Sequence, residues 1–313
     1  MESDEYLDFS PYFRIYKDGR IERYVKFPYT PPSNDPQSGV RSKDVKISPE
    51  TGLTVRIYVP STIAADEKLP VIIYAHGGAF VIESAFSPLY HPYTNSLSAE
   101  AKAIVISIEY RLAPENPIPA CYDDSWTAFK WVAKHCNSGN GSDPWINSHA
   151  DFSRVFLAGD SAGANIVHRI MVRYGANDGE LVDKITIVGM VLVHPFFGNG
   201  KPDKLWTYIA PENGSADDPL LNPMAHPSSL SSLKCSRILV CTAEKDFIRD
   251  RSYRYYDALK RSGWGGEVEF KETEGEEHCF FLEKPDCEKA KVLMQWVVSF
   301  VNKRNIIIIR SKS

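Results

Sequence analysis

The chain alternates short apolar runs rich in β-branched residues with segments of helical period, a pattern typical of parallel βαβ units. Strands buried on both faces of a parallel sheet read as continuous apolar runs. Such runs predict five central strands, at Val71–Tyr74, Ala103–Ile108, Arg154–Leu157, Ile187–Val193 and Arg237–Val240. Helical stripes cover the faces of this sheet, one with Trp126, Phe129 and Ala133 and one with Leu293, Trp296, Val297, Phe300 and Val301. The sequence therefore predicts an α/β fold with a mostly parallel central sheet and helices on both faces.

Segments outside this alternation predict the accessory parts of the fold. Ile21–Phe27 and Leu53–Val59 alternate polar and apolar residues, as half-exposed antiparallel edge strands do, and 31–39 between them is predicted to be a loop. Residues 198–232 are rich in Pro, Gly, Asn, Asp and Ser and interrupt the pattern. We interpret 1–313 as a single domain, with 1–40 and 198–232 as cap or lid segments and 303–313 as a tail that contains Ile306–Ile309.

Charge and composition exclude several classes of partner. The chain has 313 residues, 36 basic and 40 acidic side chains and a net charge of -4, so nothing favours nucleic acid or an anionic membrane as a partner. A small, mostly uncharged molecule fits better. The acidic start, Met1–Glu5, leads into no apolar segment, so we expect a cytoplasmic protein without a secretory signal. The six cysteines form no CxxC pair, so we expect reduced thiols, no metal site and no cofactor.

The strongest chemical signal is the motif Gly159-Asp160-Ser161-Ala162-Gly163, which follows a predicted strand and opens a helical segment. A sharp strand-to-helix turn exposes the serine hydroxyl, and glycines on either side let strand and helix approach each other. The start of the helix also favours negative charge that develops nearby. The motif predicts that Ser161 is a nucleophile.

A serine hydroxyl needs a base to remove its proton, and in this chain order the histidine follows the acid. Of the eight histidines, four precede Ser161, two follow it too closely, and His226 lies in the 198–232 segment before the strand that should carry the acid. His278 remains, in a loop between the β-like Glu267–Phe270 and the last helix. We therefore predict that His278 is the base.

The carboxylate that orients this histidine should follow the strand at 237–240, because catalytic groups gather at the carboxyl ends of parallel strands. The candidates are Glu244, Asp246 and Asp250. Asp246 is best placed at the start of the loop, whereas Asp250 lies between two arginines and suits an ion pair or a helix cap. Asp246 would fix the His278 tautomer and stabilise the imidazolium without taking the proton.

A glycine turn, His76-Gly77-Gly78-Ala79-Phe80, follows the strand at 71–74. A tetrahedral intermediate needs backbone N–H donors aimed at its oxyanion, and a glycine turn presents them without side chains in the way. Such a turn works together with the N–H of the residue after the nucleophile. We predict that Gly77, Gly78 and Ala162 form the oxyanion hole.

These motifs, together with Glu109-Tyr110-Arg111-Leu112-Ala113-Pro114-Glu115 and Asp218-Pro219-Leu220-Leu221-Asn222-Pro223, resemble the plant carboxylesterases of the hormone-sensitive-lipase group. The likeness runs from about Pro11 to Asn302 and is greatest to the branch of the 2-hydroxyisoflavanone dehydratases. It implies the α/β-hydrolase fold, the triad Ser161, Asp246 and His278, and an oxyanion hole that includes Gly77 and Gly78. Ala79 stands where many relatives have a third glycine, but its N–H is kept.

The resemblance leaves three functions open. The first is a serine carboxylesterase that forms an acyl-enzyme on Ser161. The second is a lyase, either 2-hydroxyisoflavanone dehydratase-like or a related cyclase, in which His278 removes a proton next to a carbonyl. The third is a binder without chemistry, similar to the gibberellin receptors, which have lost the histidine. The intact triad favours the esterase.

Aromatic residues near the predicted loops suggest an apolar or aromatic substrate group. We predict that substrate contacts involve Phe80, Tyr90, Phe196, Trp206 and Phe280.

Overall fold

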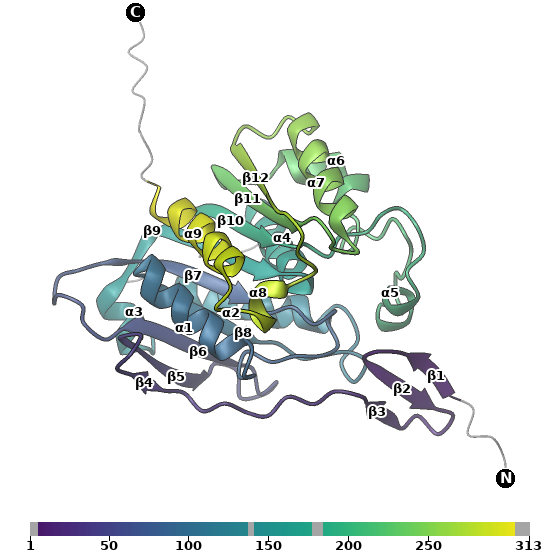
Figure 1. Cartoon of the computed structure of the whole chain (residues 1–313), viewed down its shortest axis with the longest axis horizontal. Helices are drawn as coiled ribbons and strands as arrows, with labels where there is room; N and C mark the ends of the chain where they lie inside the picture. Colours follow the sequence, from purple (N-terminus) through teal and green to yellow (C-terminus); the bar gives the residue numbers. More distant parts are fainter. Residues whose placement is uncertain (1–5, 137–140, 177–183, 304–313) are drawn as a thin grey trace, which may run out of the picture.

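A central parallel sheet organises the protein (Figure 1). The computed structural model describes residues 6–136, 141–176 and 184–303. Parallel strands lie side by side in the order β8, β7, β9, β10, β11, β12. Their bounds are β7 Leu69–Ala75, β8 Ile104–Glu109, β9 Ala150–Asp160, β10 Ile187–Val193, β11 Arg237–Ala243 and β12 Glu267–Thr273. Each of the five apolar runs falls in one of these strands, so the predicted parallel sheet is confirmed.

Antiparallel strands extend the sheet beyond β8. They are β6 Thr54–Pro60, β5 Val40–Lys46 and the two-residue β4 Asn34–Asp35. The antiparallel prediction for 53–59 is confirmed, but its place at an edge is wrong, because β6 lies between β5 and β8 and its five central residues are buried. The sequence does not predict β5, because its residues, Val-Arg-Ser-Lys-Asp-Val-Lys, are too polar to indicate a strand.

The N-terminal residues form a separate three-stranded antiparallel sheet of β1 Tyr6–Phe9, β2 Phe13–Tyr16 and β3 Ile21–Arg23. The antiparallel edge strand predicted at 21–27 is confirmed in type but is wrong in extent, because only its first three residues form a strand, which pairs with β2 at the edge of this small sheet. The side chain of Arg23 joins this small sheet to the body of the protein, where it donates to the carbonyl oxygen of Ala113 at 3.0 Å and pairs with Glu115.

Helices cover both faces of the main sheet, and alternate strand residues point to two separate cores. Ile73 packs into the core beneath α2 Ala120–Lys134, α4 Ala162–Gly175 and α7 Arg249–Arg261. Ile72 and Tyr74 pack on the opposite side, beneath α1 Tyr90–Ala101 and α9 Glu288–Asn302. The two predicted helical stripes lie in α2 and α9. Two short helices complete the body, α3 Pro144–His149 and α8 Phe280–Glu283.

The segment 198–232 divides into two parts with different neighbours. Its first part contains α5 Lys204–Ile209, which contacts the N-terminal sheet: the Tyr208 ring lies 4.7 Å from the Phe9 ring, and Lys204 Nζ donates to the Asp8 carbonyl oxygen at 2.8 Å. The second part, the 3-10 helix Pro223–Ala225 and α6 Pro227–Ser231, packs beside α7. Only the first part has these contacts with the N-terminal sheet.

Two expectations concern the membrane and the tail. Among the helices of the described ranges, none has the length and apolar character that crossing a bilayer requires. The Ile306–Ile309 run lies outside the described residues.

The β9–α4 turn lies very close to the backbone at the end of β7. A Cβ on Gly163 would lie 2.0 Å from the carbonyl oxygen of Ala75, and one on Gly159 would lie 2.8 Å from the same atom. Both glycines are required because any side chain would push the turn that carries Ser161 away from β7.

We expect Gly163→Ala to destabilise the protein by about 1–3 kcal/mol or more, because the new methyl group must displace backbone atoms. The loss appears as a lower unfolding temperature, with turnover reduced in parallel. Gly265→Ala is the matched control, because a Cβ there meets nothing within 4 Å. Equal melting temperatures for the two variants would contradict the steric argument.

Candidate active site

Ser161 occupies a strained turn at the point where β9 meets α4. Its backbone has φ 50° and ψ -118°, in a region that non-glycine residues rarely adopt. The turn is held by its own N–H, which donates to the Val193 carbonyl oxygen of β10 at 2.9 Å, and by the Phe196 N–H, which donates to the Ser161 carbonyl oxygen at 3.0 Å. This conformation places the serine side chain above the carboxyl edge of the sheet, at the start of a helix.

A continuous hydrogen-bonded chain connects three side chains that are distant in sequence. His278 Nε2 lies 3.0 Å from Ser161 Oγ, and His278 Nδ1 lies 2.9 Å from Asp246 Oδ2. The imidazole stands on the loop after β12, and the carboxylate stands on the loop after β11. These distances allow a proton to pass from the hydroxyl to Nε2 while Nδ1–H donates to the carboxylate.

The environment of Asp246 favours its ionised form. Burial of this side chain alone would raise its pKa, but the hydrogen bond and charge of His278 and the Ile248 N–H at 2.8 Å outweigh burial, so its pKa lies below the usual value. Asp246 therefore presents a fixed negative charge to the imidazole.

The two other acids considered for this role point elsewhere. Glu244 is exposed and accepts the Gly275 N–H at 2.7 Å, which fastens the loop that carries His278. Asp250 is exposed in the first turn of α7. Of the three candidates, only Asp246 contacts the imidazole.

A second histidine, His194, supports the loop next to His278. It is fully buried, and its Nδ1 accepts the Cys279 N–H at 2.8 Å. Burial lowers the pKa of His194 to about 3, so the ring is neutral. A neutral ring beside the triad avoids a second positive charge next to the imidazolium that forms during proton transfer.

The glycine turn after β7 supplies candidate oxyanion donors, and one of the three predicted donors, Gly77, is wrong. The Gly77 N–H already donates to the Tyr90 hydroxyl at 2.8 Å, so it is not available to an oxyanion. The N–H groups of Gly78, Ala79 and Ala162 make no hydrogen bond within the described chain, and both Gly78 and Ala79 line the cavity above Ser161. Gly78 has φ +102°, and a Cβ there would lie 2.2 Å from the Ile82 carbonyl oxygen, so the turn requires glycine at this position.

Asp160, next to the serine, ties this turn to its surroundings. The carboxylate is completely buried and accepts from the Tyr74 hydroxyl at 2.6 Å and the Tyr90 hydroxyl at 2.7 Å. The Cys279 thiol lies 3.5 Å away. Burial raises the pKa of Asp160, and these hydrogen bonds oppose the rise. The network links the nucleophile turn to the glycine turn, to α1 and to the His278 loop.

A cavity of about 220 Å³ lies above the serine. It is lined by Tyr12, Gly78, Ala79, Ile82, Glu83, Leu89, Tyr90, Asp160, Ser161, Phe196, Phe247, His278, Cys279, Leu282 and Glu283. Two of the predicted substrate contacts, Tyr90 and Phe196, belong to its wall.

Three predicted substrate contacts do not line this cavity. Phe80 and Trp206 are buried with their rings 5.4 Å apart, and the Trp206 indole donates to Asp218 at 3.0 Å. Phe280 is buried against His194. The sequence could not distinguish these core aromatic residues from cavity residues, because both kinds follow the same loops.

Other cavity residues were missed by sequence reasoning. Phe247 is 74% exposed and its ring lies 5.0 Å from the His278 ring, a position that its place directly after Asp246 could have indicated. Tyr12 comes from the N-terminal sheet and has no signal in the sequence. Glu83 introduces an acid into a largely apolar wall.

One group within the described ranges has the composition of a metal site. Ligand atoms of His194, His278 and Cys279 lie within 4.8 Å of one another. Both nitrogens of His278 and Nδ1 of His194 take part in the contacts given above, and burial raises the pKa of the Cys279 thiol well above its usual value. The arrangement is that of a hydrogen-bonded proton relay rather than of a set of free ligands.

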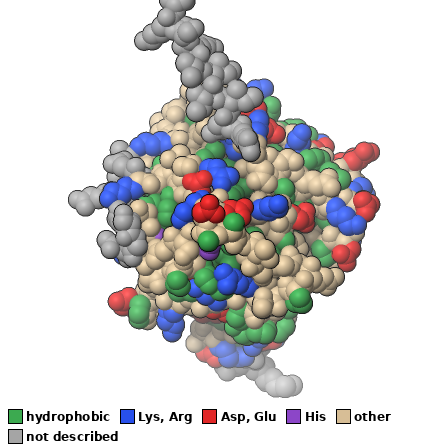
Figure 2. Space-filling model, turned by 90° about the vertical axis from the view of Figure 1, so that its left-hand side faces the viewer, with side chains coloured by type: hydrophobic (Ala, Val, Ile, Leu, Met, Phe, Trp, Pro, Cys, Tyr) green, Lys and Arg blue, Asp and Glu red, His purple; other side chains and the backbone are tan. Residues whose placement is uncertain are grey.

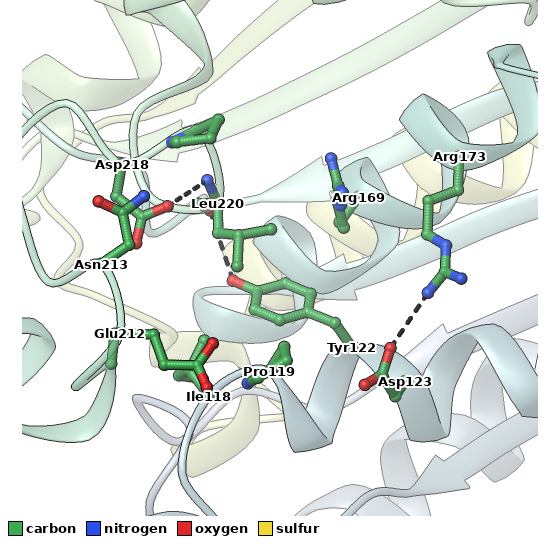
Figure 3. A pocket seen from close by; sticks show the side chains of 12 residues that line it. Ile118, Pro119, Tyr122, Asp123, Arg169, Arg173, Glu212, Asn213, Asp218 and Leu220 are labelled. Atoms are coloured by element: carbon green, nitrogen blue, oxygen red, sulfur yellow. Dashed lines mark hydrogen bonds and ion pairs between the residues drawn. The ribbon is translucent and has the colours of Figure 1, made fainter.

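A separate cavity of about 330 Å³ lies between α2, α4 and the 210–220 loop (Figure 3). None of its lining residues is shared with the cavity above Ser161. Several of its polar groups are paired with one another, as in the Arg173–Asp123 ion pair at 3.2 Å and the Leu220 N–H that donates to Asp218. We interpret it as a packing crevice.

The chain belongs to the alpha/beta hydrolase fold family, whose profile matches residues 72–282. It is 42% identical to a 2-hydroxyisoflavanone dehydratase of Glycyrrhiza echinata over 93% of this chain and 94% of that protein. It is 43% identical to "Probable carboxylesterase 13" of Arabidopsis thaliana over 96% and 99% of the two chains. Among solved structures it is similar to an esterase of Pyrobaculum calidifontis, with 26% identity, a TM-score of 0.68, and coverage of 83% of this chain and 84% of that one.

Tyr90→Phe tests the network around Asp160. Without the hydroxyl, the Gly77 N–H loses its acceptor and the buried Asp160 loses a donor, so we expect a stability loss of about 1–3 kcal/mol and a lower kcat. Thermal unfolding and ester turnover measure the two effects. Tyr93→Phe is the control, because the Tyr93 hydroxyl on the same helix makes no hydrogen bond within the described chain. Unchanged stability and kcat in Tyr90→Phe would show that the network does not hold the glycine turn.

Proposed function

We propose that this protein is a serine carboxylesterase that hydrolyses small carboxylic esters through an acyl-enzyme on Ser161. One observation carries the proposal: Ser161 Oγ, His278 and Asp246 form an unbroken hydrogen-bonded chain, with contacts of 3.0 and 2.9 Å, at the wall of a cavity. Family membership and the esterase relatives support the same reaction class.

In the first half of the reaction, Ser161 Oγ attacks the ester carbonyl carbon and His278 Nε2 takes its proton. The carbonyl oxygen becomes an oxyanion, which the N–H groups of Gly78, Ala79 and Ala162 stabilise. The intermediate then collapses, the bond to the alcohol oxygen breaks, and the imidazolium returns the proton to the leaving alcohol. Asp246 stabilises the imidazolium throughout.

In the second half, a water molecule gives a proton to His278 Nε2 and attacks the carbonyl carbon of the acyl-enzyme. The same N–H groups hold the second oxyanion. Collapse of this intermediate breaks the bond to Ser161 Oγ, which takes the proton back from the imidazolium, and the carboxylic acid leaves. No cofactor or metal takes part in this scheme.

The cavity also limits the substrate. Its wall is mostly apolar, with Tyr12, Phe196 and Phe247 contributing aromatic rings, and suits a small apolar or aromatic acyl or alcohol group. Tyr12 comes from the N-terminal sheet, which contacts α5, so we propose that 6–23 and 204–209 cap a single catalytic domain. A cytoplasmic location is a further proposal.

A lyase is the second candidate, because one relative is a 2-hydroxyisoflavanone dehydratase. In that reaction His278 would remove a proton next to a carbonyl, the N–H donors would hold the enolate oxygen, and a hydroxyl group would leave. The positioned Ser161 hydroxyl, within 3.0 Å of the base, favours the esterase, since the lyase needs no nucleophile. The same contact argues against a binder without chemistry.

Ser161→Ala removes the nucleophile, so turnover of a short p-nitrophenyl ester should fall by about 10⁶. The exposed Ser228 provides the control, and Ser228→Ala should keep wild-type turnover. A fluorophosphonate probe should label the wild type and the Ser228 variant but not the Ser161 variant. Activity retained by Ser161→Ala would remove the acyl-enzyme mechanism.

A substrate panel separates esterase from lyase. We expect the protein to hydrolyse acetate, butyrate or aromatic esters, and to release little water from a 2-hydroxyisoflavanone, because the activated hydroxyl stands where the ester carbonyl binds. Chromatographic detection of both products measures the two rates. Water loss without any ester turnover would replace the esterase by the lyase.

A further inference from the structure

Glu83 is a half-buried acid in the wall of the active-site cavity. It lies in the loop between β7 and α1 with φ +74°, a left-handed conformation that costs energy for a residue with a side chain. Its Cβ packs over the oxyanion turn, 3.0 Å from the position of a Cβ on Gly78. Glu83 lines the same cavity as Ser161 and His278.

One carboxyl oxygen of Glu83 has hydrogen-bonding capacity left over. Its Oε2 atom is buried and has no hydrogen-bond partner within the described chain. The two other acids of the cavity differ, because Asp160 accepts from the hydroxyl groups of Tyr74 and Tyr90, and Glu283 is exposed to solvent. A buried polar atom without a partner is unfavourable, so the site favours an occupant that supplies the missing hydrogen bond.

The charge of Glu83 is also unusual. Desolvation raises the pKa of Glu83 to about 7, with the charges of Asp160 and Glu109 adding to the rise and a hydrogen bond from Ser87 opposing it. Tyr90 on α1, and His278 and Cys279 on the loop before α8, line the cavity beside it. Among the described residues, no Lys or Arg lines this cavity, so no lysine or arginine there neutralises Glu83 when it ionises.

We propose that Glu83 is a specificity-determining residue, which hydrogen-bonds a hydroxyl group of the substrate and so selects hydroxylated esters over plain and anionic ones. The inference rests on the proposed esterase function and names the substrate class of that site. A hydroxyl group both donates and accepts, so it satisfies the Glu83 carboxyl in either protonation state. An alkyl group at the same place leaves Oε2 without a partner, and a carboxylate meets an acidic wall.

Matched ester pairs test this selection. The pairs are p-nitrophenyl butyrate with p-nitrophenyl 3-hydroxybutyrate, and benzyl acetate with 2-, 3- and 4-hydroxybenzyl acetate, so that both sides of the ester bond are sampled. We expect the wild type to prefer at least one hydroxylated member in kcat/KM. Glu83→Leu should lower that preference about 10- to 100-fold and change the plain ester much less, because one hydrogen bond is lost only by the hydroxylated substrate.

Two further variants show whether the carboxyl group itself matters. Glu83→Gln keeps a donor and an acceptor at the same place and should keep most of the preference. Glu277→Gln changes an exposed glutamate next to His278 that does not line the cavity, and should leave every ratio unchanged. Equal ratios in the wild type and Glu83→Leu for all pairs would overturn the proposal.

A pH series gives a second test that does not need Glu83→Leu to fold. The p-nitrophenyl monoester of succinic acid is anionic from pH 6 to 8, and p-nitrophenyl butyrate is its neutral reference. Glu83 gains its negative charge as the pH rises through about 7, so in the wild type the kcat/KM ratio of the anionic to the neutral ester should fall over this range. The ratio cancels every pH effect that the two esters share. Glu83→Gln cannot ionise and should give a flat ratio.

The outcomes separate the two proposals. A flat wild-type ratio together with equal hydroxyl preferences would overturn the role of Glu83 while ester hydrolysis stands. A wild type that hydrolyses none of these esters and resists the fluorophosphonate would instead overturn the esterase, and with it the substrate class.

Discussion

The rest of the site depends on the hydrogen bonds that the buried carboxylate of Asp160 accepts. Asp160 stands one residue before Ser161 and accepts hydrogen bonds from Tyr74 on β7 and Tyr90 on α1, with the Cys279 thiol 3.5 Å away. Through the Tyr90 hydroxyl it also holds the Gly77 N–H. The nucleophile turn, the glycine turn and the loop of the base therefore meet at one group. Burial raises the pKa of this carboxyl group and the hydrogen bonds oppose the rise, so the geometry of the site and its local stability are coupled.

Much of this arrangement could be predicted from the sequence. Strands buried on both faces leave unmistakable apolar runs, and strand order then restricts which serine, acid and histidine can meet at one edge. Chain order selected His278 among eight histidines, and the place in the loop after β11 selected Asp246 among three acids. In the structure His278 contacts both Ser161 and Asp246. The exact donors could not be predicted in the same way. The sequence does not show that the Gly77 N–H donates to the Tyr90 hydroxyl. Because it does, the candidate oxyanion donors of this turn are Gly78 and Ala79 rather than Gly77 and Gly78.

The parts that sequence reasoning missed share a physical cause. The polar β5 forms through its pairing with β6, and its own residues carry little hydrophobic signal. Tyr12 reaches the cavity because the small N-terminal sheet is fixed to α5 and, through Arg23, to the body. Both features depend on contacts between segments far apart in the chain, which no local pattern encodes. Conversely, Phe80 and Trp206 stand in loops that suggested substrate contact, and tertiary packing buries them.

The chemistry of the site explains why one scaffold can serve hydrolases and lyases. A neutral imidazole oriented by a buried carboxylate, facing N–H donors, can take a proton from a hydroxyl, from water or from a carbon next to a carbonyl. What decides between these reactions is which atom of the bound molecule lies within reach of His278 Nε2. That choice belongs to the wall of the cavity, whose rings come from the N-terminal sheet and the loops after β10 and β11, and whose half-buried acid is Glu83. We therefore propose that the triad fixes the proton transfers available and that the surrounding wall selects the substrate that uses them.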